Sequence, residues 1–387
     1  MSRAWLLPEH IADVLPLQAR RIEALRRRLL DQAAGRGFEL VMPPLLEHLE
    51  SLLSGTGHAL DLKTFKLVDQ LSGRTLGLRA DTTPQAARID AHLLNREGVT
   101  RLCYCGPVLH TLPSGLSASR EPLQLGAEIF GHAGLEADLE VQELVLDSLA
   151  AAGITALTID LADARVLQGA LAGVSVDAAA LQDVVVALSN KDAPALRELT
   201  AGFPDEARHA LAALLRLYGG ADVLAAARSE LPARPLITRA LDDLQWLANH
   251  LAAAYPNLHI GFDLGDMSGY TYYSGPRFAL YAGAGSDALA RGGRYDEVGS
   301  IFGRKRPAVG FSLDLKVLAE RTGAEPARPG IRATWGEDRA LRTAVRRLRD
   351  AGEAVVYTLP GHTQDPPADG CDRELVHIGG QWLLRAL

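Results

Sequence analysis

The first group of residues whose types suggest chemistry lies at residues 78–84. There Asp81, Thr82 and Thr83 follow a β-prone run and precede Pro84 and a helix-prone run. Two interpretations fit. A carboxylate or hydroxyl can accept the free N–H groups at a helix start, and proline suits the first helical turn. The same groups can instead bind a ligand, because a carboxylate neutralises an amine and hydroxyls donate and accept hydrogen bonds.

The second group lies on the β-prone run 124–131. Side chains alternate along a strand, so Gln124, Gly126 and Glu128 share one face. They make a polar floor in which the small Gly126 leaves room between two hydrogen-bonding groups. Such a face is either solvated or lines a ligand site.

The third group is aromatic. Tyr272 and Tyr273 follow Tyr270 closely, and Tyr295 lies within the glycine-rich residues 292–296, which are followed by residues 307–311. A tyrosine has an apolar body and a polar tip, so it can enclose a ligand ring, but core packing alone also explains these residues.

The elements that must position these groups are indicated by apolar periodicity and by glycine and proline. An antiparallel sheet flanked by helices is predicted, with a helical insertion at about residues 163–254, which are rich in Ala and Leu. The fold class is therefore α+β. The predicted strands are residues 38–42, 75–80, 101–110, 124–131, 156–161, 259–264, 270–282 and 308–313, and the predicted helices are residues 17–34, 84–94 and 136–152.

A linker is predicted at residues 323–330, and a small α/β domain is predicted after it. Residues 331–335, 338–351 and 354–359 indicate a βαβ unit, and residues 375–384 indicate a hairpin that turns at two glycines. From Arg328 to the end there are nine Arg, no Lys and eight Asp plus Glu. This near balance offers no strong phosphate-binding surface.

Length and composition exclude several classes of protein. The 387 residues are 48% hydrophobic and carry a net charge of −7, which indicates a multi-domain globular chain with no general attraction to phosphate. No apolar run is long enough to span a membrane, and no secretory signal precedes the first helix, so we expect a cytoplasmic protein. Three cysteines make neither a disulfide framework nor a good zinc site, and no nucleotide-binding or hydrolase motif occurs. The sequence predicts no metal and no cofactor.

Taken in order, the three groups resemble the catalytic domain of class II histidyl-tRNA synthetases, over about residues 5–320. Pro44 and residues 55–57, 105–108, 292–296 and 307–311 also fit that family's pattern. The resemblance implies a class II aminoacyl-tRNA synthetase-like domain at residues 1–322 and a pocket for free histidine. The residues that it implies around histidine are Asp81, Thr83, Gln124, Glu128, Tyr272, Tyr273 and Tyr295.

The sequence departs from that family where ATP would bind. His110 stands where the motif 2 arginine is expected, and Leu112 stands where a glutamate is expected. Ser268 replaces the arginine that leads the tyrosine element, Thr271 replaces its acid, and Val317 stands at the motif 3 arginine. Losing one preorganised charge stabiliser costs ~10²–10³ in rate. Three missing arginines therefore predict that no residue is catalytic.

A chain that keeps the amino-acid pocket, lacks these arginines and has a reduced domain at residues 331–387 resembles the ATP phosphoribosyltransferase regulatory subunits. These are synthetase paralogues without aminoacylation activity. The resemblance implies assembly with the short-form catalytic subunit in a hetero-octamer of four plus four chains, on a homodimer core that involves residues 38–46. It also implies feedback inhibition by free L-histidine, with neither tRNA nor a membrane as partner.

Three alternatives remain open. The chain can be an active histidyl-tRNA synthetase, or an assembly scaffold that is insensitive to histidine. The effector can also bind at the contact between the two chain types instead of in the synthetase-like pocket. The polar loop at residues 111–119 is either a moving element or a passive remnant.

Overall fold

The structure is a computed structural model, and it describes residues 6–53, 57–113, 115, 118–270, 272–283, 287–301, 303–323, 329–362 and 370–387. The chain divides into two compact units, Met1–Gly323 and Ala324–Leu387. In the described part of the chain, no helix is long and apolar enough to cross a membrane.

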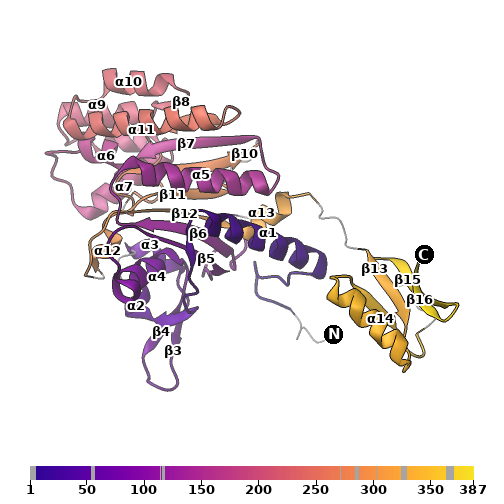
Figure 1. The fold of residues 1–387 in the computed structure, drawn as a ribbon. Coiled ribbons are helices and arrows are strands. Elements are labelled where there is room, and N and C mark those ends of the chain that lie inside the picture. The colour runs from indigo at the N-terminus through magenta and orange to yellow at the C-terminus, as the bar shows by residue number, and fades with distance from the viewer. Residues whose placement is uncertain are drawn as a thin grey trace. The chain divides into compact units, whose positions relative to one another are not determined.

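One large sheet organises the first unit (Figure 1). Its strands are β1 (Glu39–Leu40), β5 (Thr100–Pro107), β6 (Leu123–Phe130), β7 (Leu157–Asp163), β8 (Tyr218–Gly219), β9 (His259–Asp263), β10 (Pro276–Ala282), β11 (Ala290–Arg294) and β12 (Ala308–Asp314). They lie in the order β1-β5-β6-β12-β11-β10-β7-β9-β8. The pairs from β5 to β7 are antiparallel, as predicted. The prediction is wrong for β1 with β5 and for β7 with β9, which are parallel pairs.

The predicted strand at residues 270–282 is wrong at its start, because β10 begins only at Pro276. The backbone turns before it: the N–H groups of Tyr272 and Tyr273 both donate to the carbonyl of Gly269, at 2.8 and 3.1 Å. Gly269 has a φ of +72°, which side-chain-bearing residues rarely adopt. Both tyrosines therefore lie in a loop beside the sheet instead of within a strand.

The main hydrophobic core on one face of the sheet includes buried residues of α1 (Pro16–Gly35), α5 (Leu135–Ala151), α11 (Pro235–Ala254) and α13 (Leu315–Arg321). The helix predicted at residues 17–34 is confirmed as α1, and its apolar stripe of Ile22, Leu25, Leu29 and Ala33 is buried in this core. The helical segment packs into the same core through α6 (Ala164–Ala170), α7 (Ala178–Ser189), α8 (Ala193–Leu199), α9 (Asp205–Leu214) and α10 (Asp222–Glu230).

The opposite face of the sheet carries a smaller core that includes Leu102, Tyr104 and Tyr295. α4 (Thr83–Arg88) and α12 (Val298–Ile301) lie there (Figure 1). The helix predicted at residues 84–94 is α-helical only to Arg88 and continues as the π-helix η1 (Ile89–Leu94). A separate three-stranded sheet contains β2 (Leu46–His48), β4 (Thr75–Leu78) and β3 (Lys66–Val68), with α2 (Leu49–Leu53) and α3 (Gly57–Lys63) following β2 in the chain.

The second unit contains the predicted βαβ arrangement. Its elements are β13 (Gly330–Thr334), α14 (Arg339–Asp350), β14 (Val355–Thr358), β15 (Cys371–Ile378) and β16 (Gln381–Ala386). β13 and β14 are parallel, and β15 and β16 form the predicted hairpin. Ile331, Leu341 and Leu375 are buried in a core of its own.

The hairpin turn gives a first testable prediction. Gly379 and Gly380 have φ values of +58° and +83°, so both central residues of the two-residue turn are left-handed. Gly379→Ala should lower the free energy of unfolding by about 1–2 kcal/mol, whereas Gly379→Asn should cost less because asparagine tolerates this conformation. Hydrogen exchange of the β15 and β16 amides measures the difference, and equal exchange in both variants would contradict it.

Candidate effector site

The polar face of β6 is buried instead of solvated. Leu125, Ala127 and Ile129 face the main core, so the alternating residues face the other side of the sheet. There Gln124 is 9% exposed and Glu128 is 1% exposed. Buried polar side chains need hydrogen-bond partners, and both of these residues have them.

Glu128 accepts hydrogen bonds from two tyrosines. The Tyr104 hydroxyl donates to Oε1 at 2.9 Å, and the Tyr295 hydroxyl donates to Oε2. Tyr104 also lies 2.9 Å from the Thr83 hydroxyl, which joins α4 to the sheet. A Cβ at Gly310 on the neighbouring β12 would overlap the Glu128 carboxylate, and a Cβ at Gly126 would overlap the Tyr104 ring. Both glycines therefore give the buried groups room.

Burial, and to a smaller degree the nearby Asp81 carboxylate, raise the pKa of Glu128, while hydrogen bonds from the Tyr295 and Tyr104 hydroxyls lower it, and the net pKa is about 8. Burial also raises the pKa of Tyr273 to about 12 and holds the pKa values of Tyr104 and Tyr295 well above their usual range. Near neutral pH the site therefore presents a protonated Glu128 among neutral phenols.

Asp81 and Gln124 are joined at the start of α4. Gln124 Nε2 donates to Asp81 Oδ1 at 2.8 Å, while Gln124 Oε1 accepts the backbone N–H of Thr82 at 2.8 Å. Asp81 Oδ1 also accepts the Thr83 N–H at 3.0 Å. The capping interpretation is thus right for Asp81 and Pro84, which occupies the first helical turn, but Thr82 makes no side-chain cap.

The tyrosines form an aromatic wall beside Glu128. The rings of Tyr272 and Tyr295 stack with centroids 5.1 Å apart, and Tyr273 meets Tyr272 edge to face at 5.3 Å. The Tyr272 hydroxyl is buried without a hydrogen bond of ordinary geometry among the described residues. The Thr83 side chain acts on this hydroxyl, and a ligand group can still complete its hydrogen bonding.

The predicted histidine-site residues are brought together around neighbouring cavities. Asp81, Thr83, Glu128, Tyr272, Tyr273 and Tyr295 line a cavity of about 60 Å³. Asp81 and Tyr273 also line a larger, more open cavity of about 440 Å³, together with Gln124 and His110. A third cavity of about 200 Å³ adjoins Tyr273 on the β10 side.

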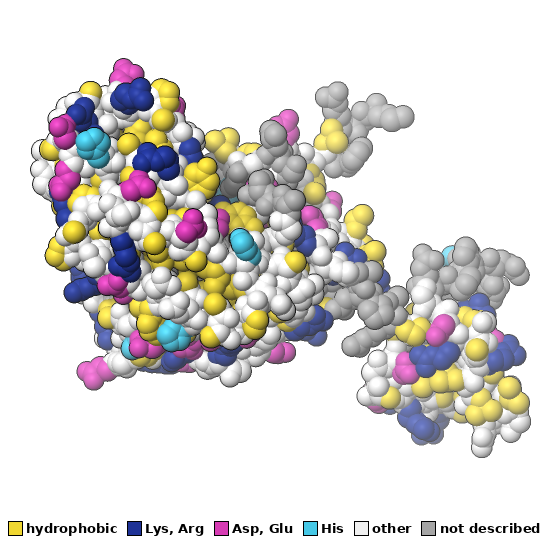
Figure 2. Space-filling model, turned by 90° about the horizontal axis from the view of Figure 1, so that it is seen from above, with side chains coloured by type: hydrophobic (Ala, Val, Ile, Leu, Met, Phe, Trp, Pro, Cys, Tyr) yellow, Lys and Arg dark blue, Asp and Glu magenta, His cyan; other side chains and the backbone are white. Residues whose placement is uncertain are grey.

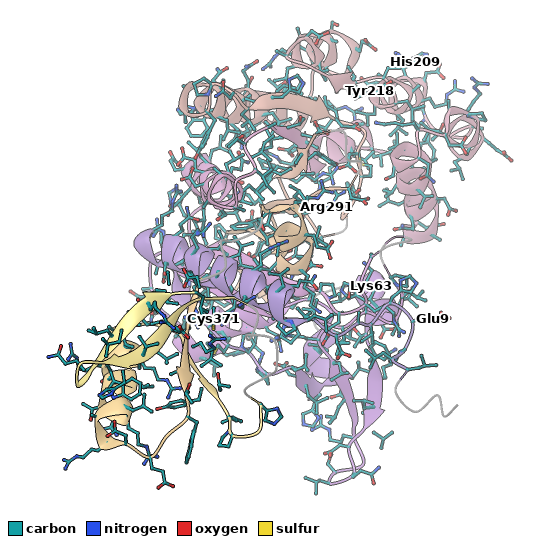
Figure 3. The ribbon with its side chains drawn as sticks, turned by 90° about the vertical axis from the view of Figure 1, so that its right-hand side faces the viewer. Glu9, Lys63, His209, Tyr218, Arg291 and Cys371 are labelled. Atoms are coloured by element: carbon teal, nitrogen blue, oxygen red, sulfur yellow. The ribbon has the colours of Figure 1, made fainter. Side chains whose placement is uncertain are left out.

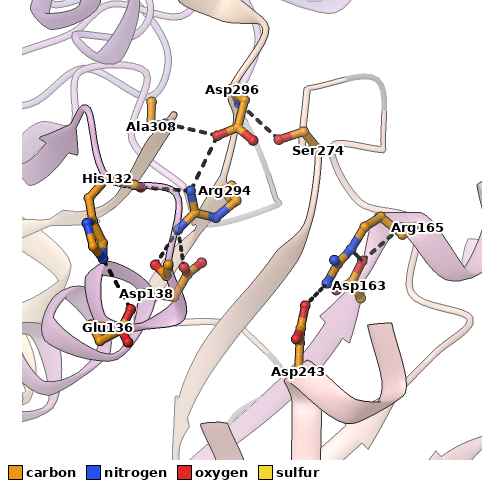
Figure 4. A network of polar contacts seen from close by, with 11 residues as sticks. His132, Glu136, Asp138, Asp163, Arg165, Asp243, Ser274, Arg294, Asp296 and Ala308 are labelled. Atoms are coloured by element: carbon orange, nitrogen blue, oxygen red, sulfur yellow. Dashed lines mark hydrogen bonds and ion pairs between the residues drawn. The ribbon is translucent and has the colours of Figure 1, made fainter. Parts of the chain in front are cut away.

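Charged residues flank Tyr295 in the chain, and Figure 4 shows the contacts of these neighbours, Arg294 and Asp296. Arg294 is buried, pairs with the buried Asp138 and donates to the carbonyls of His132 and Gly134 at 3.1 and 3.0 Å. Asp296 accepts the Ala308 N–H and donates its own N–H to Ser274, both at 2.9 Å. These bonds fix the backbone on both sides of the phenol, so the motif at residues 292–296 positions Tyr295.

The positions that depart from the synthetase pattern offer no phosphate clamp. Burial lowers the pKa of His110, whose ring bonds the Ala80 carbonyl at 2.9 Å. Leu112 is exposed, and the Ser268 hydroxyl donates to Asp266 at 2.6 Å. Val317 is partly exposed. Thr271 lies outside the described residues.

Two cations near these positions, Arg120 and Lys316, are already engaged. Arg120 stacks on the Phe65 ring at 5.1 Å and donates to the His110 carbonyl at 3.1 Å. Lys316 donates to the Glu121 carbonyl at 2.7 Å. Neither side chain is thus free to clamp a phosphate. Among the described residues, no group of three or more His, Cys, Asp or Glu side chains could hold a metal ion.

Sequence reasoning missed Tyr104 and Arg291. Tyr104 on β5 lies opposite Gly126 on β6. A glycine within the polar face of a strand leaves room for a bulky side chain on the neighbouring strand, and this was the signal for Tyr104. Arg291 on β11 lines all three cavities. Its strand was not predicted, so no pattern pointed to it.

Comparison with known proteins finds two matching families. Residues 10–318 match the histidyl-tRNA synthetase family, and residues 328–385 match the C-terminal domain of the ATP phosphoribosyltransferase subunit HisZ. Proteins named ATP phosphoribosyltransferase regulatory subunit are 61% identical in Variovorax paradoxus and 58% identical in Albidiferax ferrireducens. Each alignment covers 99% of this chain and 100% of the relative.

Solved structures confirm the predicted fold class. A Bacillus halodurans protein described as an ATP phosphoribosyltransferase regulatory subunit/histidyl-tRNA synthetase is 27% identical with a TM-score of 0.81, covering 94% of this chain and 95% of that one. The histidyl-tRNA synthetase of Nostoc is 18% identical with a TM-score of 0.77, covering 99% of this chain and 97% of that one, which shows the shared fold.

Proposed function

The chain belongs to the family of ATP phosphoribosyltransferase regulatory subunits, which are non-catalytic members of an enzyme complex. We propose that it binds free L-histidine beside Glu128 and that this binding changes the activity of the catalytic subunit. The observation that carries the proposal is a contrast within one unit. The residues that we assign to histidine binding line adjoining cavities. The positions at which a synthetase has arginines for ATP are instead His110, Ser268 and Val317.

We place the imidazole ring of histidine among the tyrosines, next to Glu128. The phenol rings supply an aromatic wall, and the protonated carboxyl can donate to a neutral imidazole nitrogen or pass its proton to it. The α-ammonium then lies toward Asp81, Thr83 and Gln124, which offer oxygen acceptors. In this arrangement the 60 Å³ cavity beside Glu128 opens toward the 440 Å³ cavity, with which it shares Asp81 and Tyr273.

For partners, we propose the short-form catalytic subunit, in a hetero-octamer of four plus four chains built on a homodimer core in the cytoplasm. The complex performs the first step of histidine biosynthesis. We propose residues 163–254 as a helical insertion, residues 323–330 as the linker, and residues 331–387 as a domain too reduced to read tRNA. Figure 2 shows a face on which acidic and basic side chains are interspersed, unlike a phosphate-binding surface.

Histidine can inhibit only if it binds one conformation of the complex better than the other. A coupling of about 1–3 kcal/mol corresponds to inhibition by roughly 5–150-fold. The loop at residues 111–119 is a candidate for the moving element. Its start is fixed by Thr111, which donates to the Leu62 carbonyl at 2.6 Å, and Arg120 beyond its end donates its N–H to His10 at 2.9 Å.

Two assays on the purified chain test the function. Calorimetric titration should show histidine binding both by the chain alone and by its complex with the catalytic subunit, and ATP–pyrophosphate exchange with histidine should be absent. Exchange at synthetase-like rates would establish an active synthetase instead. A lack of histidine binding in both states would leave a scaffold, and binding only with the catalytic subunit would favour a site at the contact between the chains.

The affinity for histidine should have a pH optimum. Glu128 has a pKa of about 8 in the free protein, and imidazole has a pKa of about 6.5. Between these pH values, Glu128 and the imidazole ring together hold one proton before and after binding, so binding takes up or releases none. Above pH 8 a proton must be taken up, and below pH 6.5 one must be released, so affinity should fall up to about tenfold per pH unit on either side. Titrations from pH 5.5 to 9 measure this. A constant affinity across pH 7–9 would contradict the role of Glu128.

A further inference from the structure

The residues proposed above to hold histidine carry no positive charge. Its titratable members are the carboxyl groups of Asp81 and Glu128 and the three phenols, and His110 nearby is held neutral because burial lowers its pKa. A free amino acid, however, carries a carboxylate as well as an ammonium group. Moving that carboxylate out of water is costly unless a cation or several donors receive it.

Three cationic side chains line the described parts of the three cavities: Lys63, Arg277 and Arg291. Arg277 is already committed, because it is 5% exposed, pairs with Asp266 at 2.9 Å and donates to the Ser268 carbonyl. Lys63 lies at the end of α3 and lines only the 440 Å³ cavity, away from Glu128.

Arg291 differs from both. It lies on β11, immediately before Gly292, which lines the 60 Å³ cavity together with Glu128, and Arg291 itself lines all three cavities. It forms no ion pair with any residue that the structure describes, and its described partner is the Tyr281 hydroxyl. Figure 3 shows Arg291 and Lys63 at separate places in the first unit. Arg291 is thus a guanidinium at the junction of the cavities that no carboxylate among the described residues neutralises.

We infer that Arg291 receives the α-carboxylate of the bound amino acid, which makes the site selective for an unesterified amino acid. The inference rests on the proposed histidine site. It adds a contact for the carboxylate to the proposed contacts of the ammonium with Asp81 and of the imidazole with Glu128. Ser268, where the resemblance predicts an arginine, lines the same 200 Å³ cavity as Arg291. The positive charge is therefore supplied from β11 instead of from the loop before the tyrosines, and a guanidinium suits the fork of a carboxylate.

Calorimetry with histidine and with histidinol, which has an alcohol in place of the carboxylate, tests the inference on the full chain and on its complex with the catalytic subunit. Wild type should bind histidinol about 10- to 100-fold more weakly than histidine, the loss expected for one charge-assisted contact. Arg291→Met should weaken histidine binding by a similar factor and leave histidinol binding unchanged. Arg291→Lys should recover part of the loss, and Lys63→Met should have little effect.

Equal losses for both ligands in Arg291→Met would show that Arg291 only supports the fold, and they would overturn the inference. The same holds if wild type binds both ligands equally, or if Lys63→Met, instead of Arg291→Met, removes the discrimination. These outcomes leave the histidine site itself intact, because wild type still binds histidine. Absence of histidine binding by wild type in both states would overturn the proposed function and this inference together.

Discussion

Replacing Glu128 with glutamine should weaken histidine binding by about 10- to 100-fold and, at the same time, stabilise the fold above pH 7. The first effect follows because an amide keeps the shape of the carboxyl but cannot share a proton with imidazole, so a charge-assisted bond of about 1.5–3 kcal/mol becomes a neutral one. Calorimetric titration measures it, with Glu198→Gln on the exposed surface as the matched control.

The second effect follows from the raised pKa. Glu128 titrates near 8 in the folded protein and near 4.5 in the unfolded chain, so the folded state holds the extra proton between these values. Stability contributed by that proton is lost as pH rises, at up to about 1.4 kcal/mol per unit. Glutamine removes this dependence. Urea unfolding should therefore show that Glu128→Gln raises the free energy of unfolding, relative to wild type, more at pH 8.5 than at pH 6.

The two effects have opposite signs, and this separates a binding role from a structural one. The gain in stability follows from the buried carboxyl alone, whereas the loss of histidine affinity requires contact with the ligand. Unchanged histidine affinity together with higher stability would contradict the proposed contact between Glu128 and the ligand.

Replacing Arg294 with methionine should destabilise the first unit by about 3–5 kcal/mol, because it leaves Asp138 buried without its cation. Burial raises the pKa of Asp138 to about 6 even with Arg294 beside it. Without Arg294, folding must keep Asp138 protonated, so the loss should grow as pH rises above 6. Histidine binding should also weaken, since Arg294 holds the backbone next to Tyr295.

Urea unfolding at pH 6 and pH 8 measures this effect. The double variant Arg294→Met with Asp138→Asn should recover much of the loss at pH 8, because the unpaired charge is gone. Arg101→Met is the matched control, since Arg101 pairs with Glu140 at a partly exposed site and its loss should cost about 1 kcal/mol or less. Equal losses in Arg294→Met and Arg101→Met would contradict the account of the buried pair.

The sequence predicted the central strands and the main helices because their side-chain periodicity reflects burial. The stripe on α1 is an example, and Gln124, Gly126 and Glu128 lie on one face of β6 as the alternation of a strand requires. It did not predict that this face is buried. Periodicity records which residues share a face, and only tertiary packing decides whether α4 and the tyrosines cover that face.

Other features escaped prediction for related reasons. β11 contains two adjacent glycines between arginines, which is not typical of a strand, and its conformation depends on pairing with β10 and β12. Arg291 was missed with it. The loop before β10 looked like a strand because tyrosine favours strands, whereas the turn at Gly269 decides its path. The resemblance supplied the roles of the site residues, which no spacing in this chain could have given.

The central claim is that this chain makes the catalytic subunit sensitive to histidine through the cavity at Glu128. The most direct test is the phosphoribosyltransferase activity of the co-purified complex across histidine concentrations, for wild type and for Glu128→Gln. The account predicts inhibition of wild type and a shift of the inhibition curve to about 10- to 100-fold higher histidine in the variant. Identical inhibition curves for the two complexes would contradict it.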